Sequence, residues 1–172
     1  QIFISDSVPL DISSVAFDIS PGISINRRDG TTIQGGLFTL EHINPNSKFN
    51  FQLRVNNLPN YLLGILFKVI YLINKGIVLV GGKKRAGLGY ISIIIDKIIY
   101  KTSDKTSLLD YDDLDNLTIK DFKLEQLNES NIKDYEINIP LSDLKEKSRE
   151  EFSDILIEYF MEAWDKFVRD KY

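Results

Sequence analysis

The sequence predicts an α+β fold, and three patterns support that prediction. In residues 49–55 every second residue is apolar, which is the period of a half-buried strand. The run YLLGILFKVIYLI at residues 61–73 is almost wholly apolar and predicts a buried helix. Beyond Ser148, apolar residues recur at helical spacing and predict a long amphipathic helix.

The N-terminal part is predicted to consist of strands. Residues 3–17 are strand-like with a turn marked by proline. Residues 21–32 begin with a Pro-Gly turn signal, continue as a short strand and end in an exposed Arg-Arg-Asp-Gly tip. Residues 35–43 and 48–55 are two further strands joined by the turn sequence Asn-Pro-Asn-Ser. We therefore expect these two strands to pair as a hairpin.

The middle of the chain combines a helix with two apolar strands. Residues 61–73 are too few to span a bilayer, and Lys75 with Gly76 is a typical helix stop. A short strand is predicted at residues 77–80, followed by a glycine-rich loop. Residues 90–101 give the strongest strand signal in the chain.

The C-terminal part changes in character. Residues 101–121 are polar and acidic and predict an irregular connection. Ser148 and Glu151 form a capping box that opens the long helix. Its apolar stripe has two possible destinations, the core of its own domain or the surface of a partner subunit. The stripe consists of Phe152, Ile155, Leu156, Tyr159, Phe160, Ala163, Trp164 and Phe167.

Charge divides the chain into two parts. Residues 1–100 carry a net charge of +4 and residues 101–172 a net charge of −8, which together give the formal net charge of −4. We therefore predict a core at residues 1–100 that can present a basic face. Residues 101–172 form an acidic connection followed by the C-terminal helix, which packs on that core.

The glycine-rich loop GGKKRAGLGY at residues 81–90 raises the question of a phosphate site. Gly82 and Gly87 have the spacing of a P-loop, but Leu88 and Gly89 stand where the motif needs Lys and Ser or Thr. A dinucleotide-binding fingerprint requires a helix after the glycines, whereas a strand is predicted here. These mismatches exclude both nucleotide-binding motifs.

What remains is a flexible basic loop. Its glycines allow the backbone to approach a polyanion, and its three cations attract phosphates without reading bases. The alternative is a solvated hairpin tip, because cations are common there. The loop residues concerned are Gly81, Gly82, Lys83, Lys84, Arg85, Gly87 and Gly89.

Other candidate sites are weaker. The chain has no cysteine, which excludes disulfides and thiolate metal sites. His42 is the single histidine and is predicted to have a structural or surface role. The acidic stretch DYDDLDN at residues 110–116 lacks the central glycine of a calcium loop, and Leu114 occupies a ligand position, so we interpret it as a solvated acidic loop. We expect no metal, no cofactor and no catalytic residue.

Three segments, in this order, resemble the CRISPR-associated RAMP superfamily. FISDSVPLD at residues 3–11 resembles its Ser-Asp-containing strand. INRRDGTTIQGGLFTLEHINPNSKFNFQLRV at residues 25–55 resembles its basic tip, strand, Pro-containing turn and aromatic strand. GGKKRAGLGYISI at residues 81–93 resembles its glycine-rich loop. The resemblance covers about residues 1–100 and is strongest to backbone subunits of type III effector complexes.

The resemblance implies a modified ferredoxin-like, RRM-type fold that holds guide RNA by its backbone. Lys83, Lys84 and Arg85 with their glycines become guide contacts, and Arg27 and Arg28 become candidates on a protruding hairpin that wedges between bases. The implied partners are guide RNA, target RNA, other RAMP subunits and copies of itself, in the cytoplasm and without a membrane.

The chain also departs from the family pattern. The first strand and helix of that fold, and the Asp that cleaves target RNA, are expected upstream of Gln1. Asp6 and Asp29 do not match that Asp, so we expect no nuclease activity from residues 1–172. Two alternatives stay open: an RNA-cleaving subunit that uses an upstream Asp, and an unrelated protein-interaction domain whose basic loop is incidental.

Overall fold

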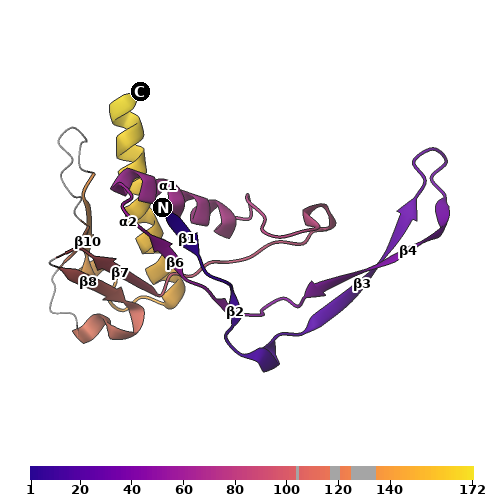
Figure 1. Cartoon of the computed structure of the whole chain (residues 1–172), viewed down its shortest axis with the longest axis horizontal. Coiled ribbons are helices and arrows are strands. Elements are labelled where there is room, and N and C mark those ends of the chain that lie inside the picture. Colours follow the sequence, from indigo (N-terminus) through magenta and orange to yellow (C-terminus); the bar gives the residue numbers. More distant parts are fainter. Residues whose placement is uncertain (104, 117–120, 125–134) are drawn as a thin grey trace. The chain divides into compact units, whose positions relative to one another are not determined.

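The structure confirms an α+β fold of antiparallel strand pairs and two helices (Figure 1). It is a computed structural model that describes residues 1–103, 105–116, 121–124 and 135–172. The chain forms two compact units, Gln1–Asn57 and Leu58–Tyr172. None of the helices in the described ranges has the length and apolarity needed to span a bilayer.

The N-terminal unit is a nested set of antiparallel pairs. Strand β1 (Ile2–Ile4) pairs with β6 (Leu53–Val55), and β2 (Val8–Pro9) pairs with β5 (Phe49–Asn50). A 3₁₀ turn at Ile12–Ser14 follows β2. The longest pair is β3 (Phe17–Ile25) with β4 (Thr32–Ile43), drawn as a ribbon in Figure 1.

The predicted hairpin of residues 35–43 with 48–55 is wrong. Strand β4 pairs with β3 instead, and Pro21 and Gly22 lie inside β3 rather than in a turn. The β3–β4 register places Phe17 opposite Ile43 and Ile23 opposite Leu37. Such apolar cross-strand pairs on one face select this partner.

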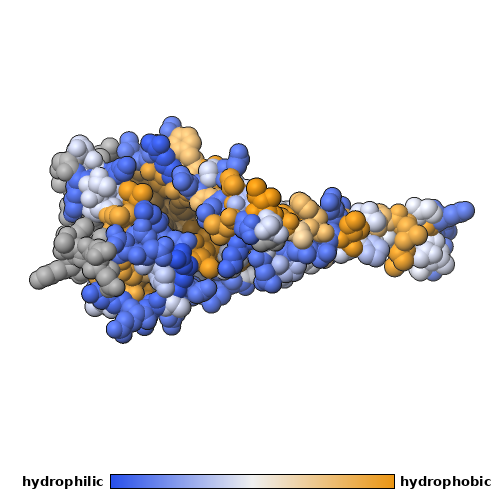
Figure 2. Space-filling model, turned by 90° about the horizontal axis from the view of Figure 1, so that it is seen from below, coloured by the Kyte–Doolittle hydropathy of each residue, from blue (hydrophilic) through white to orange (hydrophobic). Residues whose placement is uncertain are grey.

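The β3–β4 ribbon exposes the apolar side chains of that face. Leu37 is 75% exposed, and Figure 2 shows apolar residues at the surface along the ribbon. On the opposite face, Gly22 lies under the ring of Phe38, so closely that a Cβ there would come within 2.3 Å of the ring. The glycine therefore leaves room for the aromatic side chain.

The C-terminal unit contains both helices and two of the strand pairs. Helix α1 (Asn60–Asn74) ends at Lys75 and Gly76 as predicted. Strands β7 (Lys97–Lys101) and β8 (Thr106–Asp110) pair, as do β9 (Asp121–Leu124) and β10 (Ile137–Pro140). Short 3₁₀ segments lie at Lys84–Ala86, Tyr111–Asn116 and Leu141–Asp143, and helix α2 (Arg149–Lys171) closes the chain.

Three sequence predictions fail in this unit. Residues 77–80 form no strand, and the strand expected over 90–101 is limited to β7. The stretch 101–121, expected to be irregular, contains β8, whose Leu109 is fully buried. Residues 104 and 117–120 of that stretch lie outside the described residues. Strand β8 has only two apolar residues, Leu108 and Leu109, which are adjacent and give no strand periodicity that would stand out against polar neighbours.

Helices α1 and α2 cross at close range. A Cβ on Gly64 would lie 2.7 Å from both the Phe160 carbonyl oxygen and the Trp164 nitrogen, so this glycine sets the approach. The rings of Phe67 and Phe160 stack beside the crossing with centroids 4.0 Å apart. Burial of these rings is worth a few kcal/mol each and holds the two helices together.

The C-terminal helix begins with the predicted capping box. The Ser148 hydroxyl accepts from the Glu151 N–H, and the Glu151 carboxylate accepts from the Ser148 N–H. Its apolar stripe supplies Phe152, Leu156, Phe160 and Ala163 to the core. Trp164 is only partly buried and stacks on Phe167. The stripe thus packs within its own unit, chiefly against α1 and also against β10.

Candidate nucleic-acid interface

A backbone hydrogen bond joins the two ends of the glycine-rich loop of residues 81–89. The Val80 N–H donates to the Gly89 carbonyl at 2.9 Å. Between these residues the chain makes one 3₁₀ turn, Lys84–Ala86, that begins at Lys83 in a left-handed conformation with φ of 53°. Gly81, Gly87 and Gly89 have φ of 91°, 81° and 100°, which side-chain-bearing residues rarely adopt.

Two kinds of glycine occur in the loop. Gly89 is required by the chain itself, because a Cβ there would lie 2.5 Å from the Val80 carbonyl oxygen. A Cβ on Gly82 would meet no atom within 4 Å, and Gly82 has no positive φ. No contact with the described residues explains the glycine at this position. Its missing side chain leaves the backbone open to close approach by a ligand.

The three loop cations are exposed and uncompensated. Lys83, Lys84 and Arg85 all lie on the surface, and the structure shows no carboxylate paired with any of them within its described ranges. Backbone hydrogen bonds hold this turn, from Ala86 N–H to Lys83 O and from Gly87 N–H to Lys84 O. The loop therefore offers concentrated positive charge on a fixed backbone, which suits phosphate groups.

The loop is attached to the C-terminal end of helix α1 on both sides. On the way in, Ile77 N–H donates to the Leu72 carbonyl at 2.9 Å. In the segment after the loop, the Asn74 side chain forms hydrogen bonds with both the N–H and the carbonyl of Ile93. A shallow pocket at this base is lined by residues 73–76 and 90–92. Sequence reasoning missed Asn74, although a polar residue ending an apolar helix was a visible signal.

The β3–β4 tip belongs to the N-terminal unit and is a self-contained turn. Asn26 N–H donates to Thr31 O, and Gly30 N–H donates to Asn26 O. The Asn26 side chain also accepts from Arg28 N–H. Arg27 and Arg28 are exposed, and no ion pair involves their side chains in the described part of the chain. The tip therefore presents a second group of exposed cations, two arginines without an ion-pair partner among the described residues.

A family model of the RAMP superfamily matches residues 1–92, a segment that contains both the tip and the glycine-rich loop. The chain belongs to the RAMP superfamily. No curated protein matches it. Membership supports a CRISPR-associated, RNA-binding function for this RAMP chain.

The carboxylate at the basic tip has structural partners. Asp29 of the RAMP tip accepts from the N–H and hydroxyl of Thr31, at 3.1 and 2.9 Å. These hydrogen bonds hold the pKa of Asp29 below its usual value. His42 lies opposite Asp18 in the β3–β4 register, and its Nδ1 is buried without a hydrogen-bond partner. Asp29 is thus engaged by its own turn.

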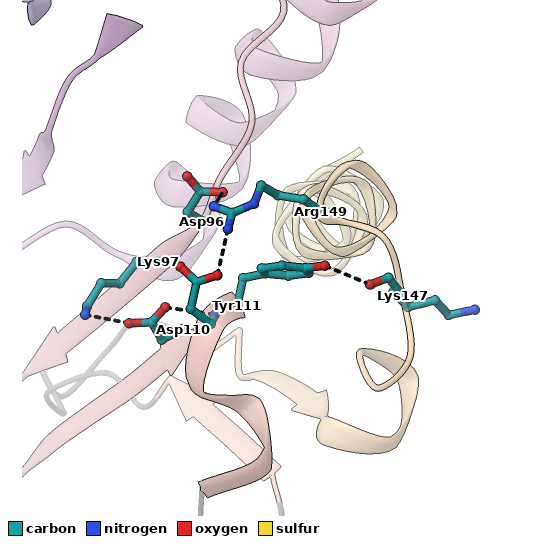
Figure 3. A network of polar contacts seen from close by, with 7 residues as sticks. Asp96, Lys97, Asp110, Tyr111, Lys147 and Arg149 are labelled. Atoms are coloured by element: carbon teal, nitrogen blue, oxygen red, sulfur yellow. Dashed lines mark hydrogen bonds and ion pairs between the residues drawn. The ribbon is translucent and has the colours of Figure 1, made fainter. Parts of the chain in front are cut away.

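The acidic stretch 110–116 anchors helix α2 rather than standing free in solvent (Figure 3). Arg149 pairs with Asp96 at 2.8 Å and with Asp112 at 2.6 Å, and its guanidinium lies 4.6 Å from the Tyr111 ring centroid. The hydrogen bond to Asp96 raises the pKa of Arg149. Lys97 pairs with Asp110 at 2.6 Å and thereby lowers the pKa of that carboxyl.

The ion pairs of Asp110 and Asp112 leave these two carboxylates little free charge with which to bind a metal cation. In the described ranges, no three His, Cys, Asp or Glu side chains come together in a way that could hold a metal ion. The calcium-loop resemblance of residues 110–116 therefore gains no support from the geometry. Opposite charges within the protein already engage Asp110 and Asp112.

Proposed function

We propose that this RAMP protein is a guide-RNA-binding backbone subunit of a type III CRISPR effector complex in antiviral defence. The observation that carries the proposal is the loop of residues 81–89, where three cations without a carboxylate partner among the described residues lie on an open glycine backbone. Such a loop binds a phosphate backbone regardless of base sequence. A subunit that holds guides of any sequence needs this kind of recognition.

The β3–β4 ribbon is the second contact in the proposal. Arg27 and Arg28 at its tip bind phosphates, and the ribbon wedges between bases of the guide and its target RNA. Its exposed apolar side chains, such as Leu37, favour contact with base faces or with a neighbouring subunit over solvent. Other RAMP subunits and further copies of this chain are the proposed protein partners.

The acidic C-terminal part has a different place in the proposal. The division at residue 100, between the RAMP core and residues 101–172, stays a prediction. With a net charge of −8, residues 101–172 repel phosphates and lie away from the guide. The apolar stripe of α2 serves its own unit first, because four of its side chains belong to the core.

The experiment is a triple substitution, Lys83→Ala, Lys84→Ala and Arg85→Ala, assayed by binding to single-stranded RNAs of unrelated sequence. We expect weaker binding to all of them, because the lost contacts are to phosphates. The plot of log affinity against log salt flattens by about 0.7 unit for each lost phosphate contact. Affinities are measured at four salt concentrations to obtain that slope.

A matched control removes three exposed cations elsewhere in the same unit, Lys145→Ala, Lys147→Ala and Lys171→Ala. The net charge changes equally, so a general electrostatic effect weakens both variants alike. A selective loss in the loop variant supports the proposal. Equal affinity and slope in the loop variant and the unmodified chain contradict it.

A further inference from the structure

The last residue of helix α1 makes a two-point contact with the chain that leaves the glycine-rich loop. Asn74 Nδ2 donates to the Ile93 carbonyl at 2.9 Å, and Asn74 Oδ1 accepts from the Ile93 N–H at 2.8 Å. The side-chain amide thus satisfies both backbone groups of one extended residue, as a neighbouring strand does. Ile93 lies in the stretch where sequence predicted a strand and the structure has none.

The segment before the loop is held by the same helix end. Ile77 and Val78 N–H both donate to the Leu72 carbonyl, at 2.9 and 3.2 Å. On the returning segment, the Tyr90 ring lies against Gly76, where a Cβ would come within 3.0 Å of the ring. Entry and exit therefore converge on the last turn of α1. The loop between them has the Val80–Gly89 bond as its own closure.

We propose that Asn74 is a positioning residue for the RNA-binding loop, an inference that rests on the proposed function. It clamps the exit segment to α1, so that the cations of residues 83–85 are already in place when RNA arrives. A loop that is ordered before binding loses less conformational entropy on binding. Without the clamp, only the fraction of molecules with a correctly placed loop binds well, and the apparent affinity falls by that fraction.

The chemistry of the contact makes asparagine specific at this position. The amide supplies one donor and one acceptor on a short stem, which matches the carbonyl and N–H of Ile93. Aspartate keeps the acceptor but places a negative charge against the Ile93 carbonyl. Neither Asn74 nor Ile93 belongs to the hydrophobic core of the unit, so loss of the clamp leaves that core intact.

The test compares Asn74→Ala, Asn74→Asp and the unmodified chain in RNA binding at several salt concentrations. Loss of two hydrogen bonds shifts a conformational equilibrium on the order of tenfold, so we expect about a tenfold weaker affinity for Asn74→Ala. Asn74→Asp is expected to lie between the two. The salt slope stays unchanged because all three cations are still present, in contrast to the loop variant.

A matched control is Asn138→Ala on β10, which removes an exposed asparagine bonded to Glu136 and leaves α1 and the loop untouched. Hydrogen exchange of residues 77–93 provides a readout that needs no RNA. We expect faster exchange there in Asn74→Ala, with unchanged exchange in α2. Unchanged affinity, or an affinity loss matched by faster exchange throughout the unit, contradicts the clamp.

The two proposals fail in different ways. If the unmodified chain binds no RNA, the proposed function is wrong, and exchange of residues 77–93 still tests whether Asn74 holds the loop. If the unmodified chain binds RNA and Asn74→Ala binds equally well, the proposed function stands and the positioning role is wrong.

Discussion

The C-terminal unit contains two cationic sites with opposite arrangements, the three cations of the glycine-rich loop and the single Arg149 at the start of α2. In the loop of residues 81–89, the cations stand exposed on a glycine backbone with no carboxylate paired to them in the described part of the chain. At the start of α2, Arg149 is held between Asp96 and Asp112 and against the Tyr111 ring. Both sites are positively charged, but only the charge of the loop is not already neutralised by carboxylates of the described residues and can attract an anionic ligand.

The difference separates binding from stability. A cation already paired with carboxylates has little attraction left for phosphate, and its ion pairs add a modest amount to folding stability. An unpaired cation contributes little to folding but releases counterions when RNA binds. Substitutions at α2 should therefore change unfolding and leave RNA affinity alone, and substitutions in the loop should do the reverse.

The largest expected effect is on the core that supports α2. Phe160 is 2% exposed and stacks on Phe67, so Phe160→Ala removes a buried ring and leaves a cavity. We expect a loss of about 3–5 kcal/mol in the free energy of unfolding. Urea denaturation monitored by circular dichroism measures it.

The same variant tests the separation between the two regions. At a temperature where Phe160→Ala is still folded, its RNA affinity should equal that of the unmodified chain. A weaker affinity with full folding would mean that the core and the loop are coupled, and the comparison would break down.

A smaller effect is expected for the paired cation itself. Arg149→Ala removes two ion pairs and the contact with the Tyr111 ring, at a side chain that is 40% exposed. Partly exposed ion pairs contribute little, so we expect about 1 kcal/mol of destabilisation. RNA affinity and its salt slope should stay unchanged, unlike those of a loop variant with one cation removed. A lower slope for Arg149→Ala would assign this cation to the RNA site as well.

The smallest effect concerns pH at the N-terminus of α2. Hydrogen bonds from Ser148 hold the pKa of Glu151 below its ordinary value of 4.5. The folded chain therefore binds the Glu151 proton more weakly than the unfolded chain does, and the resulting stability is present above pH 4.5. It is lost as the pH falls through the lowered pKa.

Glu151→Gln keeps an acceptor for the capping box but cannot titrate. The melting temperature of the unmodified chain should exceed that of the variant at pH 7, and the two should converge toward pH 3. Other carboxyls titrate in both proteins, so the difference isolates Glu151. A constant difference across this range would show that the capping box does not depend on charge.

Element types were predictable where a local pattern fixes them. The apolar run of residues 61–73 and its Lys75-Gly76 stop predicted α1, and the Ser148–Glu151 capping box predicted the start of α2. The exposed Arg-Arg-Asp-Gly tip was also predicted and lies at residues 27–30. Caps, turns and amphipathic stripes depend on residues within a few positions of one another, so the sequence displays them directly.

Pairing partners were not predictable in the same way. The apolar residues of β4 fit β3 as well as the strand after it, and only the cross-strand pairs of the folded ribbon decide between them. Residues 90–96 have strand composition, yet Asn74 and Ser153 side chains take the backbone hydrogen bonds of Ile93 and Ile95. No local pattern reveals a hydrogen-bond partner 19 or 58 residues away.

The features of the candidate site also fall into those that the sequence predicts and those that depend on the tertiary structure. By itself the sequence determined the glycines and cations of the loop, because composition alone specifies a flexible, positively charged segment. Only the tertiary structure decided that these cations have no carboxylate partner among the described residues, that the acidic stretch binds Arg149, and that Asn74 bonds the backbone of Ile93. The physical reason is that free charge and order depend on which distant groups fold against a segment, and those groups become neighbours only when the chain is folded.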